Sequence, residues 1–339
     1  MRGSDGAALA GGLPLSPPAS GAARLGEVRA RLAYPAVRWC GATYGVMERV
    51  PAGWMMSGME RATPQDARDS LGWWLRRLAG DPGLPAAVRA AYRRGADRLD
   101  RDRPDELTVA GRLFRVVRAD RFCRCGADGP EPPRPGDPDA LPEPRTRRDA
   151  GRFDHGLLPD APAPGPAAPP GDAWLPAGPA VPPELAGDAR RALATHPRAV
   201  RLPTRFTVAE LGADGPAPHG PFPHGLSLHG PFLHGPFLHG PFLHGPFLHS
   251  PAAVREHLAA YFDLVVPLLD GPSPGDVAAY RAAARLLRDG TRRAEVGVRG
   301  RRFRVVRVEY VVRRGPDGPE PPRPSERDLE EPVTGRLPR

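Results

Sequence analysis

The sequence contains no lysine, no isoleucine and no asparagine. Codons for these amino acids begin with A followed by A or T, so their joint absence indicates a gene very rich in G and C. All 48 basic residues are therefore arginines, against 39 acidic residues, and part of this arginine excess is mutational. The formal net charge of +9 is compatible with anionic partners but is weak support for them.

Cysteines and long apolar runs are also scarce. Three cysteines, Cys40, Cys123 and Cys125, are too few and odd in number for a disulfide scaffold. The apolar run 264–269 contains a proline and is too short to cross a bilayer. The first 23 residues lack the apolar core of a signal peptide. We expect a soluble, cytoplasmic protein with no membrane partner.

Proline and glycine are abundant, with 47 and 40 residues, about a quarter of the chain. This composition excludes one compact domain over the whole length. Between residues 130 and 183, 17 of 54 residues are proline. Such a stretch cannot bury enough apolar surface to fold, so we expect an extended, disordered linker.

An internal repeat organises the rest of the chain. Residues 109–137 and 298–326 are identical at 18 of 29 ungapped positions, and the match extends upstream with small gaps. We therefore predict a tandem pair of homologous modules. The predicted boundaries are a disordered tail (1–29), a first module (30–137), a Pro/Ala-rich linker (138–198), a second module (199–326) with a His-rich insertion (219–249), and a disordered tail (327–339).

Local patterns predict the same elements in both modules. Helices are expected to begin after Thr63, Ser250 and Ser273, each of which is followed by proline at the first helical position. Strands are expected near 44–50, 205–210, 295–298 and 303–312. The alternation along the last strand changes face near Val305, which predicts a bulge there. The expected fold is α+β, with a small antiparallel sheet and two helices in each module.

Two blocks carry a family resemblance. The strand sequence R-V-V-R stands at 115–118 and 304–307, and D-G-P-E-P-P-R-P follows at 128–135 and 317–324. These blocks resemble an actinobacterial family known only as a domain of unknown function, from which this sequence departs by its histidine insertion. The resemblance implies a fold unit and a bacterial lineage, but no activity and no catalytic residues.

The same proline block allows two interpretations. It could be a polyproline ligand for an aromatic groove on a partner. Alternatively, it is a rigid tail that packs back on its own module. Its identical position in both modules favours the second interpretation.

An arginine cluster is the first candidate site. Ten arginines and only three acids lie between residues 288 and 314. Guanidinium groups suit phosphates, so this strand region could bind nucleic acid or another polyanion. The alternative is a solvated face whose arginines pair with nearby acids. The candidate anion-binding residues are Arg115, Arg118, Arg304, Arg307, Arg313 and Arg314.

A histidine repeat is the second candidate site. Histidines recur every five residues, mostly as HGPFL, and imidazoles bind zinc, nickel or copper. However, the second module exceeds the first by 25 residues at this loop, which is five units of five. Loops tolerate added length at small cost, so the arithmetic favours a neutral tandem expansion. The weak metal candidates are His219, His224, His229, His234, His239, His244 and His249.

Little else indicates chemistry. Cys123 matches Val312 of the second module and is most simply a small core residue, since a metal site would need two more ligands. Nucleotide-binding, metalloprotease and serine-hydrolase motifs are absent from the sequence. The predicted function is a non-catalytic binding or structural role without a cofactor, with a protein or a polyanion as partner. The alternatives are an arginine-rich polyanion binder and a metal-binding histidine loop.

Overall fold

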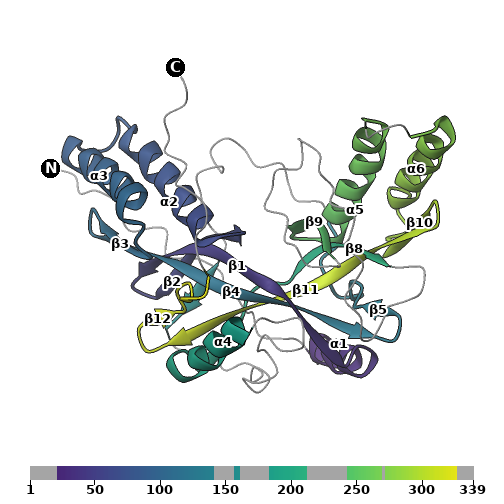
Figure 1. Ribbon diagram of the computed structural model, residues 1–339, viewed down its shortest axis with the longest axis horizontal. Coiled ribbons are helices and arrows are strands. Elements are labelled where there is room, and N and C mark those ends of the chain that lie inside the picture. Colours follow the sequence, from purple (N-terminus) through teal and green to yellow (C-terminus); the bar gives the residue numbers. More distant parts are fainter. Residues whose placement is uncertain (1–20, 141–155, 161–182, 212–242, 269–271, 327–339) are drawn as a thin grey trace.

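The computed structural model describes residues 21–140, 156–160, 183–211, 243–268 and 272–326. Helices pack on a curled antiparallel sheet, which confirms the expected α+β class (Figure 1). The small sheets expected for each module are joined in this part of the chain. They form one 12-stranded sheet whose main path is β6-β2-β1-β4-β11-β8-β9.

The first half of the chain supplies nine of the described elements. They are α1 (Gly21–Ala33), β1 (Ala36–Val50), β2 (Gly53–Arg61), α2 (Pro64–Ala79), α3 (Ala86–Asp102), β3 (Glu106–Val109), β4 (Arg112–Gly126), β5 (Gly129–Pro130) and β6 (Leu157–Pro159).

The second half repeats this order closely. Its elements are α4 (Pro183–Thr195), β7 (Arg198–Arg201), β8 (Arg205–Leu211), β9 (Leu243–Leu248), α5 (Pro251–Ala260), the π turn η3 (Tyr261–Val265), the 3-10 turn η4 (Val266–Leu268), α6 (Pro274–Leu287), β10 (Glu295–Val298), β11 (Arg301–Gly315) and β12 (Gly318–Pro319). In Figure 1, β4 and β11 cross near the centre, with α2 and α3 above one end and α5 and α6 above the other.

The helices begin where the sequence predicts. Thr63 caps α2 and Ser273 caps α6, and each forms a reciprocal capping box with the aspartate three residues later. Ser250 caps α5 by accepting a hydrogen bond from the backbone N–H of Ala253. These caps fix where the helical pairs leave the sheet.

The two central strands are buried on both faces. Residues 302–308 of β11 pair with β8 in an uninterrupted register, so the bulge predicted near Val305 is wrong. The face change arises because Val305 packs under α5 and α6, while Val306 packs in a core shared by both halves. A strand covered on both sides reads as a continuous apolar run rather than as an alternation.

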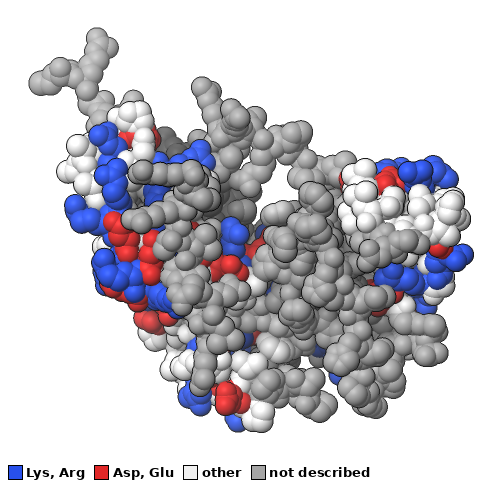
Figure 2. All heavy atoms as spheres, turned by 45° about the horizontal axis from the view of Figure 1, so that its top comes forward, with Lys and Arg blue, Asp and Glu red and all other residues white. Residues whose placement is uncertain are grey.

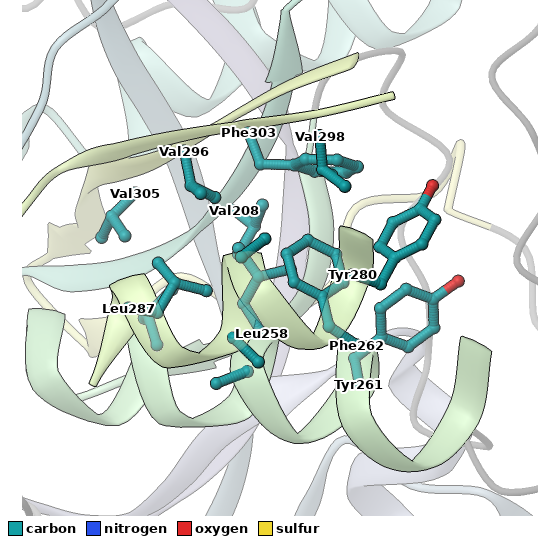
Figure 3. Close-up of a cluster of buried hydrophobic side chains, with 14 of the residues drawn as sticks. Val208, Leu258, Tyr261, Phe262, Tyr280, Leu287, Val296, Val298, Phe303 and Val305 are labelled. Atoms are coloured by element: carbon teal, nitrogen blue, oxygen red, sulfur yellow. The ribbon is translucent and has the colours of Figure 1, made fainter. Parts of the chain in front are cut away.

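Three main apolar clusters stabilise the fold. One lies under α2 and α3 and another under α5 and α6, where Phe262 packs against Tyr280 and Phe303 (Figure 3). The third is shared, because Met47 and Val117 of the first half pack in it with Val306 and Val308 of the second. The two halves are therefore joined by core packing as well as by strand pairing.

Some elements fall where disorder was expected. Helix α1 begins at Gly21, inside the predicted tail 1–29, and α4 and β6 lie inside the predicted linker 138–198. The proline count over the whole linker concealed α4, whose proline occupies the first helical position, where it is tolerated. None of the helices in the described ranges has the length and apolar character needed to span a bilayer.

Candidate functional site

The proline blocks lie between the two central strands and bond to both. The backbone N–H of Glu131 donates to the carbonyl oxygen of Arg124 in its own half at 2.8 Å. The carbonyl oxygen of Glu131 accepts from the N–H of Arg307 in the other half at 2.9 Å. The block thus packs on its own module, as expected, and also bonds to the other half, which was not expected.

The second proline block makes the reciprocal contacts. The N–H of Glu320 donates to the carbonyl oxygen of Arg313, and its carbonyl oxygen accepts from the N–H of Arg118, both at 2.9 Å. Each block thus extends the sheet at the point where β4 and β11 diverge. The arrangement satisfies backbone groups that would otherwise be buried without partners.

Two glycines make this approach possible. Gly129 and Gly318 have φ values of 110° and 124°, which residues with a side chain rarely adopt. A Cβ atom on Gly318 would lie 2.8 Å from the indole ring of Trp54, across the boundary between the halves. The tip of the β11–β12 hairpin therefore needs glycine both for its backbone and for its contact with the first half.

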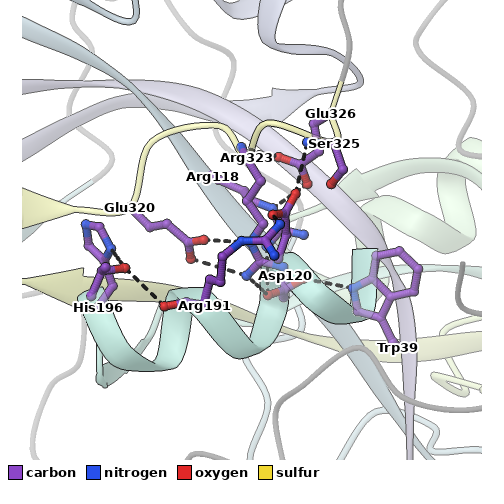
Figure 4. A network of polar contacts seen from close by, with 11 residues as sticks. Trp39, Arg118, Asp120, Arg191, His196, Glu320, Arg323, Ser325 and Glu326 are labelled. Atoms are coloured by element: carbon purple, nitrogen blue, oxygen red, sulfur yellow. Dashed lines mark hydrogen bonds and ion pairs between the residues drawn. The ribbon is translucent and has the colours of Figure 1, made fainter. Parts of the chain in front are cut away.

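Arg118 is the centre of a buried ion-pair network (Figure 4). Its guanidinium lies 2.8 Å from a carboxylate oxygen of Asp120 and donates from Nε to Glu326 at 2.5 Å. Asp120 also accepts from Trp39 Nε1 at 2.8 Å and from Arg323 at 3.4 Å. Two of these charged partners, Glu326 and Arg323, come from the end of the second half.

An equivalent network forms around Arg307. Its guanidinium bonds to the carboxylate of Glu309, and its Nε donates to Asp137 of the first half at 3.3 Å. Arg134 of the first proline block donates to Glu131 at 2.5 Å, as Arg323 donates to Glu320 at 2.6 Å. Each of these residues stands 189 positions from its counterpart, so the two networks are built from matching parts of the repeat.

The remaining arginine candidates also lie beside acids. Arg115 bonds to Glu106 and to the carbonyl oxygen of Pro319, and Arg304 bonds to Glu295 and to the carbonyl oxygen of Pro130. Arg314 bonds to Asp160 at 2.8 Å. Arg313 is 1% exposed and lies beside the charges of Asp120 and Glu320. The six candidates thus fall in two clusters along the crossing strands, most of them buried.

The charges of the networks reinforce one another. Burial by itself raises the pKa of Asp120, but the charges of Arg118 and Arg323 and the hydrogen bonds from Arg118 and Trp39 outweigh it. The net effect is a pKa below the usual aspartate value. The pKa of Glu309 is lowered in the same way by Arg307, against the effect of burial. Both carboxylates are therefore ionised at neutral pH.

Sequence reasoning found the arginines but not their partners. The signal was present, because the repeat carries an acid at both matching positions: Asp120 with Glu309, and Asp137 with Glu326. An acid two residues after each arginine of a strand lies on the same face of that strand. The spacing therefore indicated an ion pair, whereas the crossing of the proline blocks had no local signal.

The histidine repeat is described only at its end. The first five of its histidines lie outside the described residues. His244 belongs to β9, whose backbone pairs with Val208, and His249 is exposed just before the cap of α5. Within the described ranges, no group of three or more His, Cys, Asp or Glu side chains has the arrangement of a metal site.

The exposed charges are mixed in sign where they can be seen. Figure 2 shows arginines and acids side by side over the end that carries α2 and α3. Some of these form surface pairs, such as Arg98 with Asp102. Among the described residues of this end, basic and acidic side chains are therefore interspersed.

The fold and the site define an α+β protein whose two halves meet at crossing central strands and are joined there by buried, reciprocal ion-pair networks. The chain belongs to DUF5954, a family of unknown function whose model matches residues 17–222 and 242–329. The internal residues left unmatched, 223–241, lie inside the histidine repeat. No curated protein and no solved structure matches the chain.

Proposed function

We propose that the chain is a fused pair of homologous modules that acts as a non-catalytic binding or structural protein. In this proposal, the two modules form an intramolecular pseudo-dimer that holds the α2–α3 and α5–α6 pairs in a fixed relation. The observation that carries it is the reciprocal exchange of the proline blocks between β4 and β11. The arginines of the repeat then serve as an internal lock.

The pairing of the central strands supports this proposal. The register between β4 and β11 joins Phe122 to Glu309, Arg121 to Tyr310 and Asp120 to Val311. Arg121 and Tyr310 are counterparts in the repeat, so the pairing is symmetric about them. Isologous contacts of this kind, in which residue i meets residue j and j meets i, are the mark of a two-fold dimer interface.

The energetics of the two ion-pair networks agree with a role in holding the two halves together. Removing one member of a buried, hydrogen-bonded ion pair leaves an uncompensated charge and costs about 3–5 kcal/mol. Arg118 and Arg307 each bond to a carboxylate from the opposite half, Glu326 and Asp137. Separating the halves would leave both sets of buried charges without these partners at the same time.

Cleavage of the link between the halves tests the proposal. A protease recognition sequence replaces residues 166–172 of the full-length protein, and the cut protein is passed over a size-exclusion column. We expect both fragments to elute together at the size of the uncut protein. The charge-reversed double variant Arg118→Glu, Arg307→Glu should separate after cleavage, whereas Arg98→Glu, on an exposed surface pair, should not. Separation of the unmodified halves would overturn the proposal.

The alternative role in polyanion binding has its own test. An electrostatic complex with nucleic acid or heparin weakens steeply as salt rises from 50 to 200 mM, because bound counterions are released. We expect no retention on heparin at about 150 mM salt, since the arginines of the repeat already pair with acids. Retention that is lost in Arg115→Gln, Arg304→Gln would favour the polyanion role instead.

A further inference from the structure

The three cysteines of the chain meet at one place in the sheet. Cys40 lies in β1, at the irregularity in its pairing with β4 between Trp39 and Ala42. Cys123 and Cys125 lie two residues apart on β4 and therefore share a face. The Sγ of Cys40 is 3.3 Å from the Sγ of Cys123, which is 3.8 Å from the Sγ of Cys125.

The equivalent position in the second half of the chain contains no cysteine. Trp39 pairs with Phe122 in the first half, and Arg201 pairs with Val311 in the second. The residues that follow on the two edge strands are Cys40 and Leu202. The residues that follow on the central strands are Cys123 and Val312. Leu202 and Val312, which belong to one apolar cluster, thus correspond to a thiol pair in the first half. Packing alone therefore does not require cysteine here.

We propose that Cys40, Cys123 and Cys125 form a peroxide-sensitive thiol site that ends as a Cys40–Cys123 disulfide. The oxidant is a hydroperoxide. Cys123 is buried, whereas Cys40 and Cys125 are both partly exposed, and of these two we assign the first reaction to Cys125. A hydrogen bond from Cys123 lowers the pKa of the Cys125 thiol, burial opposes this, and the charge of Arg38 adds to the lowering. The thiolate is the form that attacks a peroxide.

The chemistry balances in three steps. The Cys125 thiolate attacks one peroxide oxygen, the O–O bond breaks, and the alkoxide takes up a proton to leave as alcohol, so Cys125 becomes a sulfenic acid. The thiol of Cys123 then displaces hydroxide, which takes the thiol proton and leaves as water, and a Cys123–Cys125 disulfide forms. The thiolate of Cys40 finally attacks Cys123 and releases the Cys125 thiolate. In sum, two thiols are oxidised and one hydroperoxide is reduced to an alcohol and water.

Strand geometry favours the last step. Residues i and i+2 of a strand have Cα atoms about 6.6 Å apart, near the upper end of the range that a disulfide spans. A Cys123–Cys125 bond is therefore a labile intermediate, and Cys40 is already within 3.3 Å of Cys123. A thiol of lower pKa is also the better leaving group, which again favours release of Cys125.

The experiment uses the full-length, reduced protein and one to ten equivalents of hydrogen peroxide. Trypsin cuts after Arg121 and Arg124, so the three cysteines fall in three different peptides, and mass spectrometry identifies each linkage. We expect the peptides of Cys40 and Cys123 to become joined while Cys125 stays alkylatable. Absence of this linkage in the folded protein would overturn the proposal.

Three variants test the order of the steps. Cys125→Ser should slow formation of the Cys40–Cys123 bond at least tenfold. Cys40→Ala should stop at a Cys123–Cys125 bond. Cys123→Val, which takes the residue of the matching position 312 and should keep the fold, should leave a sulfenic acid on Cys125 that dimedone traps. Bond formation at the normal rate in Cys125→Ser would overturn the role of Cys125, with circular dichroism confirming that each variant is folded.

A metal site is the competing outcome. Zinc is titrated into the reduced protein without oxygen, and alkylation of the thiols is then measured. We expect all three thiols to remain reactive at one equivalent of zinc. Stoichiometric binding that protects all three thiols would overturn the proposal in favour of a thiolate metal site.

Discussion

Replacing Arg118 by methionine should destabilise the protein strongly. The side chain of Arg118 is 1% exposed, and those of its partners Asp120 and Glu326 are 2% and 6% exposed. Methionine keeps much of the volume but leaves two buried carboxylates without this cation. We expect a loss of about 3–5 kcal/mol in the free energy of unfolding, measured by urea denaturation followed by far-ultraviolet circular dichroism.

Two further substitutions separate the charge effect from general damage. Arg307→Met removes the matching cation of the second network and should cost about the same, roughly 3–5 kcal/mol. Arg98→Met removes one member of an exposed pair with Asp102 and should cost at most about 1 kcal/mol. The thermal midpoint should fall by roughly 6–20 °C in the first two variants, since a chain of this size loses about 2–4 °C per kcal/mol.

A double-mutant cycle tests the cause directly. If the loss in Arg118→Met comes from uncompensated charge, adding Asp120→Asn should restore part of it, although Asp120→Asn alone destabilises the protein. The coupling free energy should then be about 1–3 kcal/mol. Losses below about 1 kcal/mol in both Arg118→Met and Arg307→Met, or additive effects in the cycle, would refute the account of the networks as a lock.

Three other predictions follow from the same structure. Stability should fall in acid, because carboxylates with lowered pKa values contribute fully above their unfolded values of 3.8–4.5 and lose that contribution as pH falls through the folded values. Asp120 and Glu309 are such groups. The pKa of Glu27 is lowered to about 2, since the charges and hydrogen bonds of Arg201 and Arg31 outweigh its burial. Urea midpoints of Glu27→Gln should therefore show a weaker decline below pH 4.5 than those of the unmodified protein, and an equal decline would contradict the assignment. Gly126→Ala should cost about 1–3 kcal/mol, because its Cβ would lie 2.4 Å from the carbonyl oxygen of Ala33, whereas Gly26→Ala, with open space around it, should be neutral or stabilising in the same thermal melts. Deleting residues 217–241, five units of the histidine repeat, should change the free energy of unfolding by less than about 1 kcal/mol, and calorimetry with zinc or nickel should detect no tight binding in either form; loss of a tight site on deletion would support the metal hypothesis.

Local features of the fold could be predicted because their signals are local. The caps at Thr63, Ser250 and Ser273 each depend on a side chain and a backbone group three residues apart. The long strands could be predicted from runs of β-branched residues. The bulge near Val305 was mispredicted because burial on both faces of β11 cannot be distinguished from a change of face by periodicity alone.

The candidate site could be predicted only in part. Arg115, Arg118, Arg304 and Arg307 were singled out as anion-binding candidates by their place in the repeat, and the structure pairs them with acids of the chain itself. The sequence does not say which chain segment contacts them. That information lies in the exchange of the proline blocks, which depends on contacts about 200 residues apart, such as Arg118 with Glu326. The helices α1 and α4 were missed because composition was averaged over windows much longer than either helix.

The distribution of identity along the repeat can be understood from this exchange. Residues 109–137 and 298–326 are the segments in which each half contacts the other, through β4 with β11 and through the proline blocks. In a symmetric interface, each position of the repeat occurs twice and contacts the matching segment of the other half. A substitution in one copy must therefore fit a partner segment that has not changed. Outside the interface the halves are free to differ: β1 is continuous, while its counterpart is divided into β7 and β8 around Pro203, which has no N–H for the ladder. The thiol pair of Cys40 and Cys123 lies just beyond the three positions at which β4 and β11 pair. Its matching residues in the second half are Leu202 and Val312, so the two halves differ where the symmetric contact between them ends.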